Sequence, residues 1–223
     1  MAPVIGDVLG AAIGVALSPM AVVGFILVLV SAGGLAKAWA FVGGWAVGVT
    51  FVVVVLGSVV SGAADSSPDE TRPIVASVQI VLGSVLVFLA WRRWRGRPGA
   101  GDEPKLPGWM QALDKVTAVR AAGLGLILSA VNPKNFALLI SAAGVIGQAS
   151  LNGAETAVVD VIFIVLACLG MILPLGVFIA AGDRGPSILD GARRWLVANN
   201  ATIMAVLSLI LGVNVIGKGI GGF

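Results

Sequence analysis

Residues 129–136, with the sequence SAVNPKNF, place polar and helix-breaking residues in the middle of a long apolar run. Pro133 removes a backbone donor and clashes with the preceding helical turn, so we predict a broken helix there. The carbonyl groups freed by the break need partners, which Asn132 and Asn135 can supply, because lipid offers none. Lys134 is the most demanding residue, since a lysine near the bilayer centre costs about 2.5–3.5 kcal/mol. We therefore expect Lys134 to face the protein interior.

Two interpretations of Lys134 follow from its position. In the structural interpretation, it neutralises a buried carboxylate and locks two parts of the protein together. In the functional interpretation, Lys134 and the helix N-terminus after Pro133 bind an anionic group of a substrate, because free N–H groups and the helix dipole favour anions. The two overlap, since a lysine can hold a carboxylate at rest and exchange it for substrate.

The sequence offers few acidic residues as candidate partners for such a lysine. Only Asp7 and Asp160 lie within apolar runs, each near a predicted outer end. Asp7 also fits an interfacial carboxylate, and Asp160 a residue of the first turn of a helix. If either is buried, it is a candidate for carrying a coupled proton.

Other chemistries find little support in the residue types present. The chain has no histidine and a single cysteine, Cys168, which lies in an apolar run. This excludes imidazole bases, His metal sites and a dithiol relay, and it indicates a packing role for Cys168. No Gly-x-x-x-x-Gly-Lys-Ser/Thr motif for nucleotide phosphates occurs. We therefore expect neither an enzyme nor a bound metal or cofactor.

The composition is that of an integral membrane protein. Of 223 residues, 58% are hydrophobic and 11% are charged, and the mean hydropathy is +1.05; soluble domains carry about 25% charged residues. The net charge of +3 does not indicate nucleic-acid binding, because the basic residues lie between apolar runs, as membrane topology places them. The first residues lack a basic segment and a cleavage site, so we expect no removable signal peptide.

Six stretches are long and apolar enough to span a bilayer, which takes about 20 residues per helix. They cover residues 4–30, 38–60, 74–91, 121–149, 157–181 and 201–220. The first and fourth carry Pro19 and Pro133 near their centres, so we expect these two helices to be broken. The segment SSPDETRP before the third stretch predicts a helix start, with Ser67 as N-cap and Glu70 completing a capping box.

The surroundings of the two prolines resemble each other. Residues 16–34, ALSPMAVVGFILVLVSAGG, and residues 130–147, AVNPKNFALLISAAGVIG, share a polar residue before proline, an apolar run, then serine and small residues. With three spans per half, the second half enters from the opposite side, as in the inverted repeats of secondary transporters. We predict an all-α integral membrane protein with repeats at 1–91 and 119–223 and a basic loop at 92–118. Chance similarity between two helices rich in Ala, Gly and Val is the alternative.

The basic residues predict the orientation. Placing the loop at 92–118 in the cytoplasm puts eleven basic residues on that side: Lys37, Arg92, Arg93, Arg95, Arg97, Lys105, Lys115, Arg120, Arg184, Arg193 and Arg194. Only Arg72 and Lys218 then face outside, with Lys134 inside a span. The positive-inside rule therefore places both termini outside the cytoplasmic membrane.

The six-span layout, the NPK sequence in the fourth span and the SP sequence in the first resemble the lysine exporter (LysE) superfamily. Within it, they are most similar to the GAP branch, also called Sap or sulfolipid-addressing proteins. The resemblance implies a small membrane protein that moves envelope glycolipids towards the actinobacterial cell surface. Residue by residue, it points to Ser18 and Pro19 in the first half. In the second half it points to Asn132, Pro133, Lys134 and Asn135 as substrate-binding positions.

Our leading hypothesis is a transporter or flippase for an anionic, lipid-linked envelope compound. An exporter of a small solute such as an amino acid is the first alternative, favoured by a closed polar cavity rather than a laterally open apolar groove. The second is a non-transporting scaffold that docks envelope biosynthesis proteins through residues 92–97. The expected partners are an anionic lipid substrate and membrane lipids, and the many small residues in the spans favour a homodimer.

Overall fold

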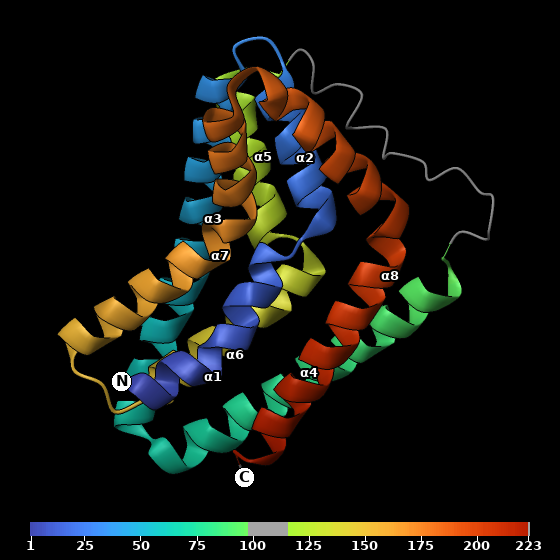
Figure 1. The fold of residues 1–223 in the computed structure, drawn as a ribbon. Coiled ribbons are helices and arrows are strands. Elements are labelled where there is room, and N and C mark those ends of the chain that lie inside the picture. Colours follow the sequence, from blue (N-terminus) through green and yellow to red (C-terminus); the bar gives the residue numbers. More distant parts are fainter. Residues whose placement is uncertain (98–115, 223) are drawn as a thin grey trace.

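The computed structural model describes residues 1–97 and 116–222, and all regular secondary structure within them is helical (Figure 1). The predicted all-α class is confirmed. The elements are α1 (Ala2–Ala16), α2 (Pro19–Val30), α3 (Gly34–Ser66), α4 (Pro68–Arg95), α5 (Ala118–Ala130), α6 (Pro133–Gln148), α7 (Gly153–Ala181), the 3-10 helix η2 (Gly182–Arg184) and α8 (Gly185–Ile220). Most of the predicted basic loop, residues 98–115, lies outside the described residues.

Two helix pairs are bent at the predicted prolines. α1 and α2 meet at 53°, and α5 and α6 meet at 65°. Pro19 and Pro133 each occupy the first position of the second helix of a pair. Proline suits this position, because its missing N–H would have no intrahelical partner there and its φ is already helical. Both predicted breaks are therefore present.

Three helical stretches of the described chain are long and apolar enough to cross a membrane, and five are if each bent pair counts as one span. One of the three runs from Gly153 to Ile220 and joins α7, η2 and α8. Figure 1 shows α7 and α8 as two arms that meet at η2. Gly182 in this turn has φ +51°, a conformation that favours glycine. The helices thus give three to five candidate spans where the sequence predicts six.

Glycines set the closest helix contacts. A Cβ on Gly44 of α3 would overlap the carbonyl oxygen of Ala122 in α5, and one on Gly125 of α5 would overlap that of Phe41. Neighbouring Gly43 and Gly123 face open space. Of the Gly43–Gly44 and Gly123–Gly125 pairs in the sequence, one member each therefore permits close packing.

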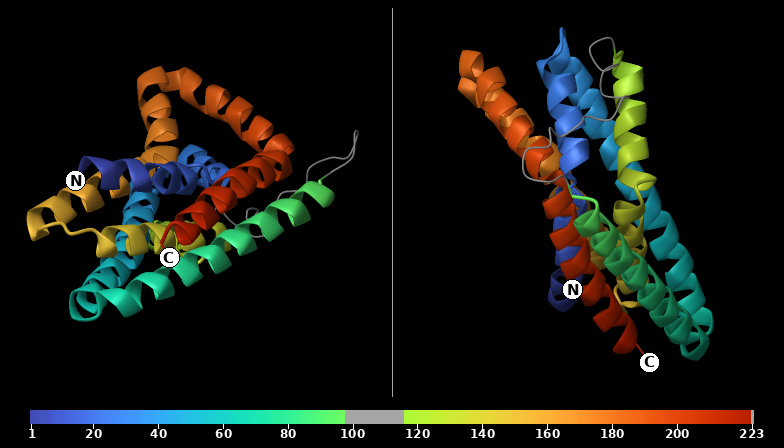
Figure 2. Two further views of the ribbon diagram at one scale, coloured as in Figure 1. Left: turned by 90° about the horizontal axis from the view of Figure 1, so that it is seen from below. Right: turned by 90° about the vertical axis from the view of Figure 1, so that its right-hand side faces the viewer.

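Two further helix pairs use the same device. Gly170 of α7 packs against the backbone of Ala16 in α1, and Gly83 of α4 packs against Gly212 of α8. Figure 2 shows α4 and α8 side by side along much of their length. Close helix contacts at small residues thus hold the described helices together, as in other membrane helix packing.

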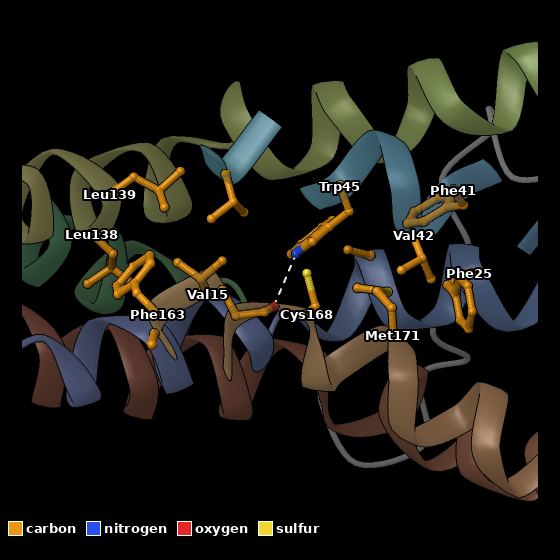
Figure 3. Close-up of a cluster of buried hydrophobic side chains, with 14 of the residues drawn as sticks. Val15, Phe25, Phe41, Val42, Trp45, Leu138, Leu139, Phe163, Cys168 and Met171 are labelled. Atoms are coloured by element: carbon orange, nitrogen blue, oxygen red, sulfur yellow. Dashed lines mark hydrogen bonds between the residues drawn. The ribbon is translucent and has the colours of Figure 1, made fainter. Parts of the chain in front are cut away.

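An aromatic cluster fills the core between α2, α3 and α7 (Figure 3). Phe41 stacks on Trp45 with ring centroids 6.5 Å apart, and Phe25 packs edge-on against Phe41 at 5.4 Å. The Trp45 indole N–H donates to the carbonyl oxygen of Ala167 at 3.1 Å, which satisfies its one polar group. Cys168 is buried beside this cluster, in agreement with the packing role expected for it.

The outer surface is apolar. Large side chains are exposed on each long helix, with Phe51 of α3 65% exposed, Val81 of α4 61%, Leu173 of α7 63% and Ile210 of α8 60%. A soluble monomer rarely exposes so much contiguous apolar surface. This surface fits contact with lipid.

One local prediction was wrong. Ser67 is the N-cap residue of α4, but its side chain makes no capping hydrogen bond there, so the box with Glu70 does not form. A complete capping box lies instead at the start of α7, between Asn152 and Glu155. Asn152 combines an extended backbone with a side-chain oxygen that accepts from the N–H of Glu155 at 3.0 Å.

Candidate functional site

The two helix breaks meet at Lys134. Its side chain is 1% exposed, and its Nζ donates to the carbonyl oxygens of Gly14 and Leu17, the latter at 3.2 Å. α1 ends at Ala16, and Pro19 cannot donate an N–H, so carbonyl groups at this end lack helical partners. A cation suits this position, because the dipole of α1 places partial negative charge at its C-terminus. Lys134 therefore caps the broken end of α1.

Ser18 and Asn135 form a second hydrogen-bonded connection between the two breaks. Ser18 is 3% exposed and Asn135 is fully buried. The Ser18 hydroxyl is within donating distance of the Val15 carbonyl oxygen, at 2.8 Å, and of the Asn135 Oδ1, at 2.9 Å. The Asn135 Nδ2 donates to the carbonyl oxygen of Leu128 near the end of α5, at 3.1 Å. Asn135 thus bridges the ends of α5 and α1.

Asn132 and the prolines shape the local backbone. The Asn132 Oδ1 accepts from the backbone N–H of Lys134 at 3.1 Å and caps α6. Pro19 and Pro133 begin α2 and α6 and turn the chain. All six predicted substrate-binding residues therefore lie at the two breaks. There Ser18 bonds to Asn135, and Lys134 bonds separately to carbonyl oxygens at the end of α1; we call these contacts the hydrogen-bonded cluster. Substrate binding by them stays a prediction.

The structural interpretation of Lys134 does not hold in its original form. Within residues 1–97 and 116–222, the ion pairs join Asp190 to Arg193 and Arg194, and no carboxylate pairs with Lys134. Carbonyl oxygens take the place of the expected carboxylate. The lysine still connects the two halves, since its own helix is α6 and its partners belong to α1 and the break that follows it.

Asp7 and Asp160 lie apart from this cluster. Asp7 is exposed near the start of α1, where its backbone carbonyl accepts from Lys218 Nζ. Asp160 is half-buried in α7, and its Oδ1 has no hydrogen-bond partner among the described residues. It faces a cavity of about 410 Å³ that Ser58, Ser61 and Thr156 also line. A proton-coupling role for either residue stays a prediction.

Cavities lie towards the two ends of α6. A small one of about 170 Å³ is lined by Ser18 and Asn132 at the breaks, together with Arg93 and Asn200. A larger one, of about 810 Å³, lies at the far end of α6, where it reaches Gln148. At 1.5 Å per residue, Lys134 and Gln148 are about 20 Å apart along the helix.

The larger cavity is polar and carries both signs of charge. Asp7, Asp65, Arg72 and Lys218 line it, with the buried Gln79. Lys134 and Asn135 line neither this cavity nor the small one. The hydrogen-bonded cluster therefore lies at the small-cavity end of α1 and α6, and the large cavity lies at their other end.

Sequence reasoning missed Arg93 and Asn200. Arg93 was assigned to a basic loop, but α4 continues to Arg95, and this places Arg93 on its last turn. Asn200 lies just outside the predicted sixth span, whereas α8 is continuous from Gly185 and buries this residue. The available signal was the pair of asparagines, Asn199 and Asn200, at the start of an apolar run.

Long apolar helices around a buried polar junction of two broken helices define a multi-pass helical membrane protein. A family model described as Sap, sulfolipid-1-addressing protein, matches residues 8–221. The chain belongs to this family. No curated protein and no solved structure matches the chain significantly.

Proposed function

We propose that this protein is a transporter or flippase that moves an anionic, lipid-linked compound of the cell envelope across or out of the cytoplasmic membrane. The observation that carries the proposal is the junction of two broken helices around the buried Lys134. Broken helices at mid-membrane depth are the usual binding elements of secondary transporters. Membership of a family named for sulfolipid addressing favours a lipid cargo over other solutes.

The helix packing supports two inverted three-span repeats. Matching α1 to α5, α3 to α7 and α4 to α8 relates the contact of α3 with α5 to that of α7 with α1, and both are close contacts at glycine. The contact of α4 with α8 maps onto itself, as it does across a two-fold axis. With α7 and α8 counted as separate crossings, this gives six spans. We extend the proposal to placement in the lysine exporter superfamily.

The distribution of helix ends supports the predicted orientation. Both termini and the turn between α3 and α4 lie at the lower end in Figure 1. The starts of α3 and α5 and the turn between α7 and α8 lie at the upper end in Figure 1, and these segments carry Lys37, Arg120 and Arg184. The positive-inside rule assigns the upper end to the cytoplasm.

Lys134 acts in this proposal as an exchangeable latch. At rest its ammonium group is held by carbonyl oxygens of α1 and the following break. An anionic head group that reaches the junction competes for the ammonium group, because a charged acceptor forms a stronger hydrogen bond than a carbonyl. Exchange frees the end of α1 and lets the two halves move relative to each other.

The test is flipping of a fluorescent sulfatide, a galactosyl lipid with one sulfate, in proteoliposomes. The matched neutral lipid is galactosylceramide with the same fluorophore. We expect flipping of the sulfated lipid, and a loss of about tenfold or more in a Lys134→Met variant, because a charge-assisted contact is removed. Lys37→Met, on the half-buried Lys37 at the start of α3, is the control.

Equal flipping of the sulfated and neutral lipids would overturn the anionic cargo. A folded Lys134→Met variant with normal flipping would remove Lys134 from the mechanism. Wild-type protein that flips neither lipid, but that binds envelope enzymes through residues 92–97, would support the scaffold alternative.

Small-solute export has one observation in its favour, the large cavity with both signs of charge. Such a cavity suits a zwitterion such as an amino acid. Efflux of radiolabelled amino acids from the same proteoliposomes, without flipping of sulfatide, would favour this function.

A further inference from the structure

The small cavity is lined by residues of both breaks and of α2, α4 and α8. Ser18 and Asn132 come from the two breaks, Arg93 from α4, and Asn200 and Met204 from α8. Residues of both predicted repeats therefore face one space of about 170 Å³. A water molecule occupies roughly 30 Å³ in the liquid, so this space has room for about six waters.

Asn200, one of the residues that line this cavity, carries an acceptor that no described residue satisfies. Its residue is 9% exposed, and its Oδ1 has no hydrogen-bond partner among the described residues. A buried carbonyl oxygen without a donor is costly. A hydroxyl group of a ligand is a donor of the right kind for this oxygen.

Arg93 supplies the positive charge. It lines this cavity and also an adjoining one of about 400 Å³ with Arg92 and Gly96 at the end of α4. The guanidinium group recognises phosphate, sulfate and carboxylate through paired N–H donors. Asn132 adds an amide whose oxygen already caps α6, so its Nδ2 is the group left to donate to an oxyanion.

We propose that this cavity is a head-group subsite that takes an oxyanion with a hydroxyl group close by, with Arg93 holding the oxyanion and Asn200 accepting from the hydroxyl. The inference rests on the proposed function, since it names where the cargo is recognised. The subsite adjoins the junction, because Ser18 both lines the cavity and lies within hydrogen-bond distance of Asn135. The cavity therefore reaches Ser18, the residue that follows the Leu17 carbonyl held by Lys134.

The test is lipid binding to the full chain in neutral detergent, measured by native mass spectrometry. The probes are short-chain phosphatidylglycerol and phosphatidylmethanol, two phosphodiesters of equal charge of which only the first carries hydroxyl groups. We expect phosphatidylglycerol to bind about fivefold more tightly, the worth of one neutral hydrogen bond. Asn200→Leu should abolish this preference and leave phosphatidylmethanol binding unchanged.

Arg93→Gln should weaken the binding of both lipids by about tenfold or more, because it removes a charge-assisted contact. Arg92→Gln is the matched control, since Arg92 is the neighbouring arginine of α4 and lines the adjoining cavity but not the small one. We expect it to stay within about twofold of wild type, because both arginines are exposed but only Arg93 lines the small cavity. Arg93→Lys, which keeps the charge and loses the fork, should fall between wild type and Arg93→Gln.

Equal effects of Arg92→Gln and Arg93→Gln would overturn the subsite, as would an Asn200→Leu variant that keeps its preference for phosphatidylglycerol. Soluble glycerol phosphate distinguishes a free anion from a lipid head group. Competition by it at the concentration at which the lipid binds would assign the cavity to a soluble ligand. Normal binding by the Arg93 and Asn200 variants, with flipping that still depends on Lys134, would remove the subsite and leave the proposed function standing.

Discussion

The replacement of Lys134 by methionine is the sharpest test of the junction. Methionine keeps the length and flexibility of the side chain and removes the charge and the three donors. In the wild-type protein Lys134 is 1% exposed, and its ammonium group donates to two backbone carbonyl oxygens, those of Gly14 and Leu17. The substitution therefore leaves two carbonyl groups without a partner in an apolar interior.

The magnitude follows from two opposing effects. Hydrogen bonds from a charged donor contribute about 1.5–3 kcal/mol each, so the two are worth about 3–6 kcal/mol. Removing the ammonium group also removes the cost of holding it in the membrane interior, about 2.5–3.5 kcal/mol. We expect Lys134→Met to lower the free energy of unfolding by about 1–2 kcal/mol, near the middle of these ranges.

The truncation Lys134→Ala should cost more than methionine does. It loses the same hydrogen bonds and also leaves a cavity, which for a long buried side chain adds about 2–5 kcal/mol. The comparison of the two variants separates the packing of the side chain from its polar contacts.

Equilibrium unfolding in mixed micelles, followed by tryptophan fluorescence, gives these values. Lys37→Met is the control, because the Lys37 Nζ lies 3.4 Å from the Ser31 hydroxyl and forms at most a weak bond. We expect it to change stability by less than about 0.5 kcal/mol. Two results would refute the assignment of the Gly14 and Leu17 carbonyl oxygens as partners of the Lys134 ammonium group. One is a Lys134→Met protein that is more stable than wild type, and the other is an alanine variant that is no less stable than the methionine variant.

Three further predictions concern the scaffold. Gly44→Ala should destabilise by about 1–3 kcal/mol or more, because its Cβ overlaps the backbone of α5, whereas Gly43→Ala, in open space, should be close to neutral in the same unfolding assay. Trp45→Phe should cost about 0.5–1.5 kcal/mol through the lost hydrogen bond between α3 and α7, measured by thermal unfolding. Asn152→Ala should cost about 1 kcal/mol as a lost N-cap, and Ser67→Ala, which loses no capping bond, should cost less; equal losses would contradict the assignment of the caps.

Much of the fold was predictable because membrane helices have few alternatives. An apolar run of about 20 residues in lipid has to satisfy its backbone internally, and this favours a helix. A proline inside such a run removes a backbone donor and favours a break, as at Pro19 and Pro133, although α7 continues through Pro174. The breaks at Pro19 and Pro133 and the burial of Lys134 followed from these local rules.

Details that depend on the chain beyond a few residues were not predictable in the same way. The capping box expected at Ser67 does not form. Such a box requires the side-chain oxygen to accept from the N–H three residues on, and with φ −150° and ψ 75° the Ser67 side chain makes no such bond. Nothing in the residue types distinguishes Gly43 from Gly44, yet only the second faces α5. The rotation of a helix about its axis decides such cases, and an apolar helix in lipid has little amphipathic pattern from which to read that rotation.

At the candidate site, too, the local features were predictable and the partners from distant parts of the chain were not. The sequence shows the demand at the site, since a proline break leaves carbonyl groups unpaired and a buried ammonium group needs acceptors. It does not show which groups meet that demand. The acceptors of Lys134 lie more than a hundred residues away, and they are backbone atoms, so no side-chain type announces them. A carboxylate was the natural expectation because side chains are the partners that a sequence displays. The Oδ1 of Asn200 is the converse case, because this buried acceptor has no hydrogen-bond donor among the described residues. For that reason it is the atom at which we expect a ligand.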